Sequence, residues 1–366
     1  MPNNNQDILF MRKALALARQ GRGMTSPNPM VGAVLVKAGR IIATGWHRQR
    51  GTDHAEVIAL NQAGAKARGA TLYLNLEPCH HDGYTPPCVE RVLRSGINKI
   101  VVAMKDPNPL TNGKSLAKLK RAGIRVKTGV LEKEARLLNE VFVKFIKDKM
   151  PFVVAKSAIT LDGKIATASG DSYWITSAQT RDLARRRRDQ FDAILVGANT
   201  VLKDNPNLNG QRKALKKIIL DSSLRISAQA KLFKKTRAAN CYIFTTKRAS
   251  SANVGMFRKR GINVEIYPRA TGRIPLRWVL KELAKKEITS ILIEGGAQVI
   301  GSALKENLVD QMHIYMAPKI IGDQKALSAV DGLGIKKINQ AIRLHHLTVK
   351  KIGQDIFLEG YVHRHH

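Results

Sequence analysis

Strand-like and helix-like segments alternate along most of this 366-residue chain, and this alternation is what most restricts its fold. In the first half, short apolar runs predict strands at 31–36, 41–44, 71–76 and 99–104, and the segments between them predict helices at 54–64, 87–95 and 115–122. The second half continues the pattern, with helices predicted at 177–188 and 275–286 and strands at 193–196, 217–220 and 290–293. Strands that alternate with helices predict an α/β fold in which helices are layered on a sheet.

Pro151 marks a candidate domain boundary. A chain of 366 residues exceeds the size at which one hydrophobic core usually keeps growing, so we expect two domains. A basic helix is predicted at 131–147, the proline stops its continuation, and a strand is predicted at 152–155. We therefore expect one domain at 1–147 and a second at 148–366.

The apolar runs and the cysteines indicate where the protein works. No apolar run approaches the ~20 residues that cross a bilayer, and Arg12 and Lys13 interrupt the N-terminal apolar stretch, which lacks a small-residue cleavage site. We expect a cytoplasmic protein with no membrane partner.

Three cysteines are too few for a disulfide framework, and a cytoplasmic thiol pair is more often a metal or catalytic site. Cys241 stands apart in a strand-like run, and we expect it in the core.

The net charge of +34, from 62 Lys and Arg against 28 Asp and Glu, would ordinarily suggest a nucleic acid as a binding partner. The excess is dispersed along the chain, however, and its densest cluster, Arg185–Arg188, lies in a predicted helix. An exposed helix face is the ordinary explanation for most of such a run. A phosphorylated small substrate needs only one or two of these charges.

His54, Glu56, Cys79 and Cys88 form the most informative set of residues. One imidazole and two thiolates supply three ligands for Zn2+ and leave the fourth tetrahedral position open for water, which is typical of a catalytic zinc site. His54 and Glu56 are two positions apart, about 200° around a helix, so both face the metal only if it lies at the N-terminal end of that helix. We expect the histidine and the two cysteines to bind Zn2+, and Glu56 to carry a proton from water to the departing amine.

The spacing around the cysteines separates two classes of deaminase. Pro86 and Pro87 precede Cys88, and proline is favoured in the first helical turn, so Cys88 is expected at a helix start. His-x-Glu followed by Pro-Cys-x-x-Cys is the signature of nucleobase deaminases. Here eight residues separate Cys79 from Cys88 instead of two, which disfavours the tRNA- and DNA-editing enzymes.

Four segments together resemble the bifunctional riboflavin biosynthesis deaminase/reductase family: PNPMVG at 27–32, DHAEV at 53–57, LEPCHHDGYTPPC at 76–88 and DPNP at 106–109. The resemblance covers nearly the whole chain. It implies a cytidine-deaminase-like α/β/α domain that removes the C2 amine of 2,5-diamino-6-ribosylamino-4(3H)-pyrimidinone 5′-phosphate as ammonia. It also implies that Asn28 and His47 bind the pyrimidine or its sugar. Tyr84 stands where the family usually has a basic residue.

The second half has a glycine turn in place of a dinucleotide-binding motif. It has no Gly-x-Gly-x-x-Gly, but Glu294-Gly295-Gly296 follows a predicted strand, and free amides at the next helix start can take a cofactor's phosphates. The segments 160–163, 174–177, 197–200 and 204–206 match the reductase half of the family in order. The resemblance implies a dihydrofolate-reductase-like α/β domain that uses NADPH to reduce the ribosyl group to ribityl.

The binding residues of the family carry over by position. Those that the resemblance places at NADPH are Ala158, Trp174, Thr200, Asp204, Ser222, Gly296, Ala297, Gln298, Val299, Ile300, Gly301 and Ser302. Those that it places at the substrate are Ser172, Arg188, Leu208 and Glu294. A guanidinium binds phosphate through two hydrogen bonds. Arg188 is therefore expected to bind the substrate's phosphate, while the other three arginines of its run stay in solvent. The family's arginine after Leu208 is out of register, and either Arg212 replaces it or 209–211 forms a turn.

Two other functions stay open at this point. One is a nucleic-acid-acting zinc deaminase with a basic binding domain, which the charge favours but the cysteine spacing and the 5% aromatic content oppose. The other is a single-activity relative whose reductase half only binds or dimerises. The resemblance favours a phosphorylated pyrimidine as substrate, no nucleic-acid partner, and a homodimer or higher homo-oligomer formed through the reductase half.

Overall fold

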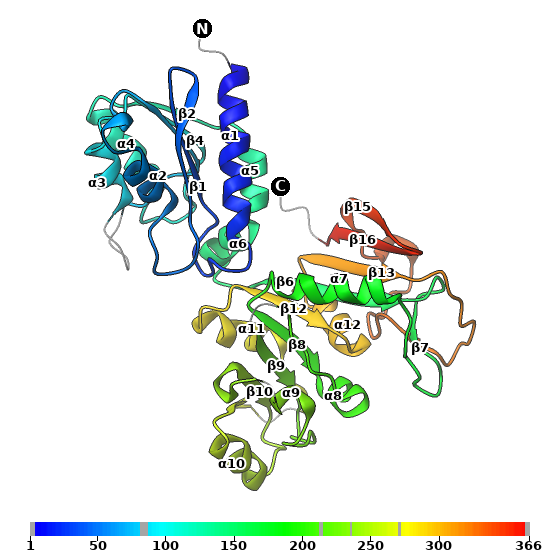
Figure 1. Cartoon of the computed structure of the whole chain (residues 1–366). Helices are drawn as coiled ribbons and strands as arrows, with labels where there is room; N and C mark the ends of the chain where they lie inside the picture. The colour runs from blue at the N-terminus through cyan, green and yellow to red at the C-terminus, as the bar shows by residue number, and fades with distance from the viewer. Residues whose placement is uncertain (1–3, 81–86, 212–214, 235, 270–271, 363–366) are drawn as a thin grey trace. The chain divides into compact units, whose positions relative to one another are not determined.

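The computed structural model describes residues 4–80, 87–211, 215–234, 236–269 and 272–362 (Figure 1). The chain divides into two compact units, Met1–Lys149 and Met150–His366. Each unit has its own main sheet, with a hydrophobic core on each face of it.

The first unit is built on a five-stranded sheet in the order β2-β1-β3-β4-β5. Its strands are β1 (Gly32–Lys37), β2 (Arg40–Trp46), β3 (Thr71–Leu76), β4 (Lys99–Met104) and β5 (Arg125–Thr128). Strand β1 runs antiparallel to both of its neighbours, whereas β3, β4 and β5 are parallel. Because parallel strands end at the same edge of a sheet, the segments that follow β3 and β4 start close together.

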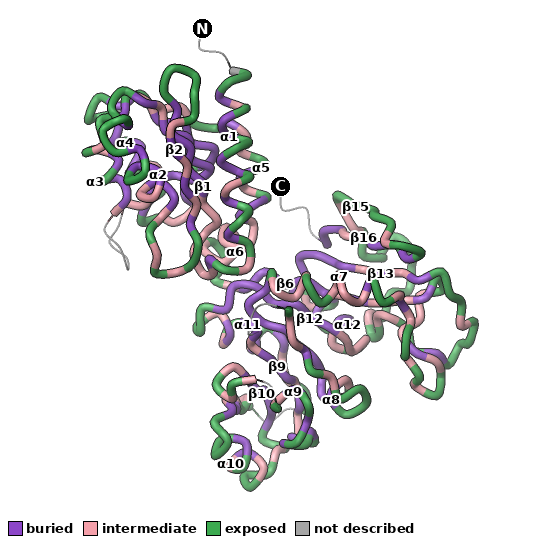
Figure 2. The backbone as a smooth tube through the Cα atoms, in the orientation of Figure 1, coloured by how far each residue is buried: buried purple, intermediate pink, exposed green. Residues whose placement is uncertain are grey.

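Helices cover both faces of this sheet. One face carries α2 (Ala55–Ala63), α3 (Cys88–Leu93) and α4 (Lys114–Arg121), and the other carries α1 (Asn4–Ala18) and α5 (Glu132–Leu138). Alternate residues of β3 face the two cores, since Leu72 and Leu74 pack with the first group of helices and Tyr73 packs with the second. Figure 2 shows the central strands as buried. The predicted α/β/α layering is confirmed.

The prediction of a single helix at 131–147 is wrong. The segment forms two helices, α5 and α6 (Glu140–Asp148), and Asn139 between them has non-helical backbone angles. The buried Asn139 side chain accepts a hydrogen bond from the backbone N–H of Met30 (2.8 Å) and donates one to the carbonyl of the same residue (3.0 Å). This contact with a distant residue interrupts a segment whose local pattern is helical throughout.

The second unit is built on a nine-stranded sheet in the order β11-β10-β9-β8-β12-β6-β13-β16-β15. Its strands are β6 (Phe152–Ile159), β8 (Ala193–Gly197), β9 (Lys216–Leu220), β10 (Cys241–Thr245), β11 (Asn263–Ile266), β12 (Ser290–Glu294), β13 (Gln311–Met316), β15 (His345–Ile352) and β16 (Asp355–Tyr361). The strands from β11 to β13 in this order are parallel, and β16 and β15 close one edge in antiparallel fashion. Strands β7 (Lys164–Ala166) and β14 (Leu327–Ser328) form a separate small sheet.

Helices also pack on both faces of the larger sheet. One core contains side chains of α11 (Leu276–Lys285) and α12 (Ala297–Lys305), and the opposite core contains those of α8 (Ala198–Asp204), α9 (Lys231–Lys234) and α10 (Ser251–Lys259). Cys241 is fully buried in the second of these cores, as predicted. Helix α7 (Ala178–Arg188) contributes no residue to either core.

A buried carboxylate ties α1 to the sheet of the first unit. Asp7 accepts hydrogen bonds from the Tyr73 hydroxyl (2.7 Å) and the Lys127 ammonium (2.8 Å), and its carboxylate pairs with Lys99 at 3.3 Å. Burial alone raises the pKa of this carboxyl, but the hydrogen bonds from Lys127 and Tyr73 and the charge of Lys99 outweigh it and leave the pKa below its usual value.

We predict that Asp7→Asn lowers the free energy of unfolding of the first unit by about 2 kcal/mol at pH 7, because three donors lose a charged acceptor. The folded-state pKa of Asp7 is lowered, so this stabilisation is complete above the ordinary carboxyl pKa and is lost as the pH falls through the folded-state value. Urea denaturation of both proteins at pH 7 and at decreasing pH measures the difference. Glu134→Gln, at an exposed position of α5, is the control, and an equal loss in both variants would contradict the role of Asp7.

Candidate functional site

Three predicted zinc ligands come together at one edge of the first unit's sheet. His54 directly precedes α2, Cys79 follows β3, and Cys88 is the first residue of α3. The His54 Nδ1 atom lies 3.0 Å from the Cys88 Sγ atom and 3.8 Å from the Cys79 Sγ atom, and the three ligand atoms all lie within 4.8 Å of one another. One imidazole nitrogen and two sulfurs at this spacing fit a zinc ion that keeps one coordination position for water.

Hydrogen bonds around Cys79 favour the thiolate that a metal needs. The Cys88 thiol and the His54 imidazole both interact with the Cys79 sulfur, and the backbone N–H of Cys88 donates to it at 3.2 Å. These donors lower the pKa of the Cys79 thiol despite its burial. Since the thiolate is the metal-binding form, these contacts favour the form of Cys79 that binds a cation.

Glu56 lies in the first turn of α2, where the sequence placed it, and its side chain is buried. Its Oε2 atom has no hydrogen-bond partner among the described residues, and burial raises the pKa of the carboxyl group. A buried, unsatisfied carboxylate oxygen is costly to a fold. Such an atom fits a group that exchanges a proton with a substrate or with water.

Asn28 and His47 lie beside the zinc-ligand cluster. The Asn28 amide nitrogen is 3.2 Å from the His47 Nε2 atom, and the His47 Nδ1 atom is 3.3 Å from the carbonyl oxygen of Asp53. The His47 ring meets the His54 ring edge-on, with centroids 5.0 Å apart. Burial lowers the pKa of His47, which favours a neutral imidazole that can accept the Asn28 bond.

Glu77 organises this site, although the sequence analysis gave it no role. It follows β3 directly, is buried, and accepts hydrogen bonds from the backbone N–H groups of Asp106 (3.2 Å) and Gly113 (2.9 Å). It therefore joins the segment that carries Cys79 to the segment that follows β4. Its place directly before Pro78-Cys79 was the available signal. Tyr84, Pro86 and Arg212 lie outside the described residues.

The second unit contains a cavity of about 1600 Å³ at the carboxyl ends of β6, β8, β9 and β12. The residues that the resemblance assigned to NADPH and that line it are Ala158, Trp174, Thr200, Asp204, Ser222, Gly296, Ala297, Gln298, Val299, Ile300 and Ser302. The assigned substrate residues Ser172, Arg188, Leu208 and Glu294 line the same cavity. Gly301 lies outside the described lining, and a Cβ atom there would approach the Asp331 carbonyl oxygen to 1.6 Å.

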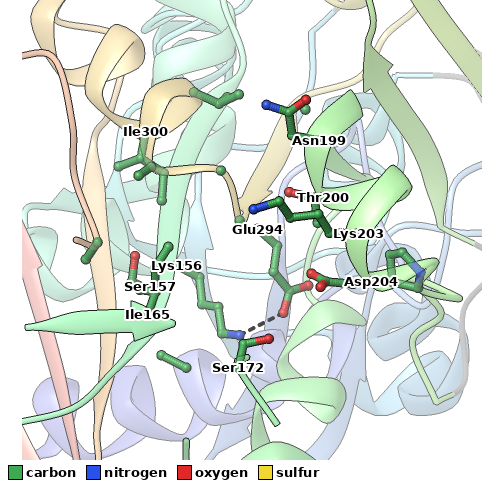
Figure 3. A pocket seen from close by; sticks show the side chains of 18 of the residues that line it. Lys156, Ser157, Ile165, Ser172, Asn199, Thr200, Lys203, Asp204, Glu294 and Ile300 are labelled. Carbon is green, nitrogen blue, oxygen red and sulfur yellow. Dashed lines mark ion pairs between the residues drawn. The ribbon is translucent and has the colours of Figure 1, made fainter. Parts of the chain in front are cut away.

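Glu294 forms the charged centre of this cavity. Its carboxylate pairs with the Lys156 ammonium at 3.0 Å and with the Arg188 guanidinium at 2.8 Å, and Figure 3 shows the first of these pairs. Burial raises the pKa of Glu294, but the two cations outweigh it and lower the pKa to about 2. Sequence analysis missed Lys156, whose only signal was a lysine within a mostly apolar strand.

The turn after β12 lets a ligand approach the backbone closely. Gly295 and Gly296 have φ values of 94° and 82°, which favour glycine, and a Cβ atom on Gly295 would lie 3.3 Å from the Thr200 hydroxyl oxygen. Helix α12 begins directly after this turn, at Ala297. At these glycines a side chain would be crowded, so the backbone is open to a ligand. The free backbone N–H groups at the start of the helix fit a cofactor's phosphates.

Lys217 fixes the loop that carries Leu208, and sequence analysis did not find it. The side chain is buried, and its ammonium donates to the carbonyl oxygens of Asn207 (2.5 Å) and Leu232 (2.9 Å) and to the amide oxygen of Asn209 (2.8 Å). Burial lowers the pKa of Lys217 to about 8. The buried ammonium therefore holds the backbone carbonyl of the residue before Leu208 and the side chain of the residue after it.

The expectation that three arginines of the 185–188 run stay in solvent is wrong for Arg187. Arg185 and Arg186 are exposed, but the Arg187 guanidinium pairs with Glu359 at 3.0 Å and lies 4.2 Å from the centroid of the Phe357 ring. The partner is 172 positions away, so no local pattern reveals it.

Comparison with known protein families matches both units. The cytidine and deoxycytidylate deaminase zinc-binding region matches residues 4–104, and the RibD C-terminal domain matches residues 151–358. The chain belongs to the RibD family. It is therefore a bifunctional enzyme of riboflavin biosynthesis, with a zinc-dependent deaminase followed by an NADPH-dependent reductase.

Relatives of this family match almost from end to end. The riboflavin biosynthesis protein RibD of Aquifex aeolicus is 44% identical over 97% of this chain and 99% of its own, and that of Escherichia coli is 36% identical over 96% and 98%. The structure of Acinetobacter baumannii RibD covers 98% of this chain and 99% of its own at 36% identity, with a TM-score of 0.88. The structure of the Thermotoga maritima diaminohydroxyphosphoribosylaminopyrimidine deaminase/5-amino-6-(5-phosphoribosylamino)uracil reductase covers the same shares at 35% identity, with a TM-score of 0.85.

Membership of the RibD family disfavours the nucleic-acid-acting deaminase with a basic binding domain. It also confirms the predicted dihydrofolate-reductase-like class of the second unit. Among the described residues, none of the helices combines the length and apolar content that a membrane crossing needs.

We predict that the purified protein holds about one zinc ion per chain and that Cys79→Ser or Cys88→Ser reduces this content to near zero, because each removes a thiolate ligand. Metal analysis after dialysis measures the content. Cys241→Ser, which changes a cysteine buried in the second unit, is the control and should retain the metal. Full zinc content in both ligand variants would contradict the assignment.

Proposed function

We propose that residues 1–147 deaminate 2,5-diamino-6-ribosylamino-4(3H)-pyrimidinone 5′-phosphate and that residues 148–366 reduce the deaminated product to 5-amino-6-(5-phosphoribitylamino)uracil. One observation carries the proposal: the chain has two separate polar clusters, a His/Cys/Cys set in the first unit and a carboxylate held between two cations in the second. Each cluster has the chemical groups that its half-reaction needs. The two compact units support the division of labour.

In the deaminase, His54, Cys79 and Cys88 would hold zinc, which supplies a Lewis acid that makes water acidic enough to react near neutral pH. The Glu56 carboxylate takes a proton from the attacking water and passes it to the C2 amine, which leaves as ammonia. Its Oε2 atom suits this task because no described residue occupies its hydrogen-bonding capacity. Asn28 and the neutral His47 lie beside the ligand cluster, where they would orient the pyrimidine or its sugar.

In the reductase, the residues around Gly296 and Thr200 would hold NADPH, which supplies the hydride for C1′ of the sugar. Glu294 holds Lys156 and Arg188 at the cavity wall, and this cluster has one more cation than anion. A net positive charge in a partly buried cavity favours a phosphorylated substrate. The Arg188 Nε donates to Glu294 and its Nη1 to the Asn209 carbonyl (2.8 Å), which fixes the direction of the guanidinium. Its remaining N–H groups would donate to a phosphate oxygen.

We place the enzyme in the cytoplasm as a homodimer formed through the reductase half. The family is the main support for both statements. A structural feature supports the dimer: the edge strand β15 exposes Leu347 and Val349, with 56% and 58% of their surfaces accessible, and a partner would cover these two apolar side chains.

We predict that Glu56→Gln keeps its zinc and loses deamination by at least about 100-fold, because the amide preserves the shape but cannot carry the proton. Ammonia release and zinc content are measured on the same sample. Near-normal ammonia release from the zinc-loaded variant would remove Glu56 from the mechanism.

We predict that the two activities separate by mutation. His54→Ala should abolish ammonia release from the diamino substrate but leave NADPH oxidation intact when the deaminated substrate is supplied directly. Glu294→Ala should have the opposite effect, because it removes the partner of Lys156 and Arg188 in the other unit. The rates of both half-reactions are measured in wild type and in the two variants to test whether the activities separate. Loss of both activities in a correctly folded variant would indicate one shared site.

A further inference from the structure

Helix α7 lines the reductase cavity with little apolar contact to hold it. Of its eleven residues, only Thr180 is buried. The stability of helices in proteins comes mostly from packing of an apolar face. The cavity-facing residues of α7, which include Thr180, Ala184 and Arg188, therefore depend on polar contacts for their position.

Strand β16 supplies an acidic side chain at each end of α7. At the N-terminal end, Asp355 accepts hydrogen bonds from the backbone N–H (2.8 Å) and the hydroxyl (2.7 Å) of Ser177. At the C-terminal end, Glu359 pairs with Arg187 at 3.0 Å. The two acids are four residues apart on one face of the strand, or ~13 Å, and Ser177 to Arg187 spans ~15 Å of helix. The spacing of the acids thus matches the length of the helix.

Glu359 also belongs to a row of side chains that leads to the active cavity. In the sheet register, Glu294 of β12 pairs with Lys156 of β6, Lys156 with His313 of β13, and His313 with Glu359 of β16. Residues paired in this way project from the same face of the sheet. Arg187 meets the outer end of the row at Glu359, and Arg188 meets the inner end at Glu294.

Arg187 is the cation that Glu359 depends on within this row. The other neighbour, His313, has its Nε2 atom 3.4 Å from the Glu359 carboxylate, but burial and the charge of Arg187 lower the pKa of His313 to about 3. A neutral imidazole does not balance the carboxylate. The stacking of the Arg187 guanidinium on Phe357 adds a second contact that fixes its direction.

We infer that the Arg187–Glu359 ion pair positions the phosphate-binding Arg188 of the reductase. Neither Arg187 nor Glu359 is among the residues that line the cavity, so both act through the helix turn that they hold. Arg188 is the next residue, and the same turn carries it to Glu294. The inference rests on the proposed role of Arg188 at the substrate.

The test is the steady-state kinetics of the full-length, zinc-loaded enzyme with the deaminated substrate and NADPH. The variants are Arg187→Met, Glu359→Gln and their combination. The matched control is Arg186→Met, which removes the same charge from the same turn. Arg186 is exposed, and its ion pair among the described residues is with Asp182 of the same helix. Arg188→Met tests the proposed function itself.

Arg187→Met and Glu359→Gln should each raise the KM for the phosphorylated substrate about tenfold, with the KM for NADPH and the rate of ammonia release changed less than about twofold. The combined variant should be no worse than the poorer single variant, because the two residues act as one pair. Arg186→Met should stay within about twofold of wild type in all three measurements. Arg187→Lys, which keeps the charge, should recover part of the substrate KM.

Two results separate the failure of this inference from the failure of the proposed function. If Arg188→Met raises the substrate KM but Arg187→Met and Glu359→Gln behave like Arg186→Met, the positioning role is wrong and the proposed function stands. If Arg188→Met leaves the substrate KM unchanged, the proposed role of Arg188 is wrong, and the positioning inference, which rests on that role, is wrong as well. Thermal unfolding accompanies each variant. Where Arg187→Met does not fold, Glu359→Gln, which keeps the size of the side chain, decides by the same KM change.

Discussion

Both sites depend on the alignment of parallel strands, which brings residues from distant parts of the sequence to one edge of a sheet. In the first unit, β3 and β4 are parallel, and the residues that follow them, Glu77 and Asp106, lie in hydrogen-bonding contact. In the second unit, the parallel register of β6 and β12 places Lys156 directly beside Glu294. The strands fix the positions, and the loops and helix starts that follow supply the chemistry.

The two sites differ in how their charges are compensated. In the second unit, the protein itself neutralises Glu294 with Lys156 and Arg188, so the carboxylate stays ionised although it is buried. In the first unit, Glu56 has an oxygen without a partner among the described residues, and Cys79 is poised as a thiolate. We propose that a metal ion and a substrate complete the first site, whereas the charged groups of the second site already compensate one another before a ligand binds. This contrast fits a hydrolytic step in one unit and a cofactor-driven reduction in the other.

The parts of this account that the sequence could predict are those encoded by short-range spacing. His54, Glu56, Cys79 and Cys88 were identifiable because each lies within or next to a predicted element at a fixed spacing from the others. Asn139 was not, since its bonds to Met30, far back in the chain, interrupt a helical pattern.

The polar contacts of the second unit could not be predicted for a related reason. Lys217 looked like one more basic residue in a chain of net charge +34, and only the fold shows that three acceptors surround its ammonium. Arg187 and Arg188 are indistinguishable in sequence, yet they meet carboxylates on strands that lie three places apart in the sheet. Such partners are set by strand order, which periodicity does not reveal.

The central claim is that one chain holds two independent sites, one that needs zinc and one that needs NADPH. The most direct test is the affinity of the full-length protein for NADPH, measured by fluorescence titration of zinc-loaded and zinc-stripped samples. The two dissociation constants should agree within about twofold, a difference of less than ~0.5 kcal/mol, because no predicted NADPH residue lies in the unit that holds the metal. Loss of NADPH binding on removal of zinc, from protein whose second unit remains folded, would contradict the account.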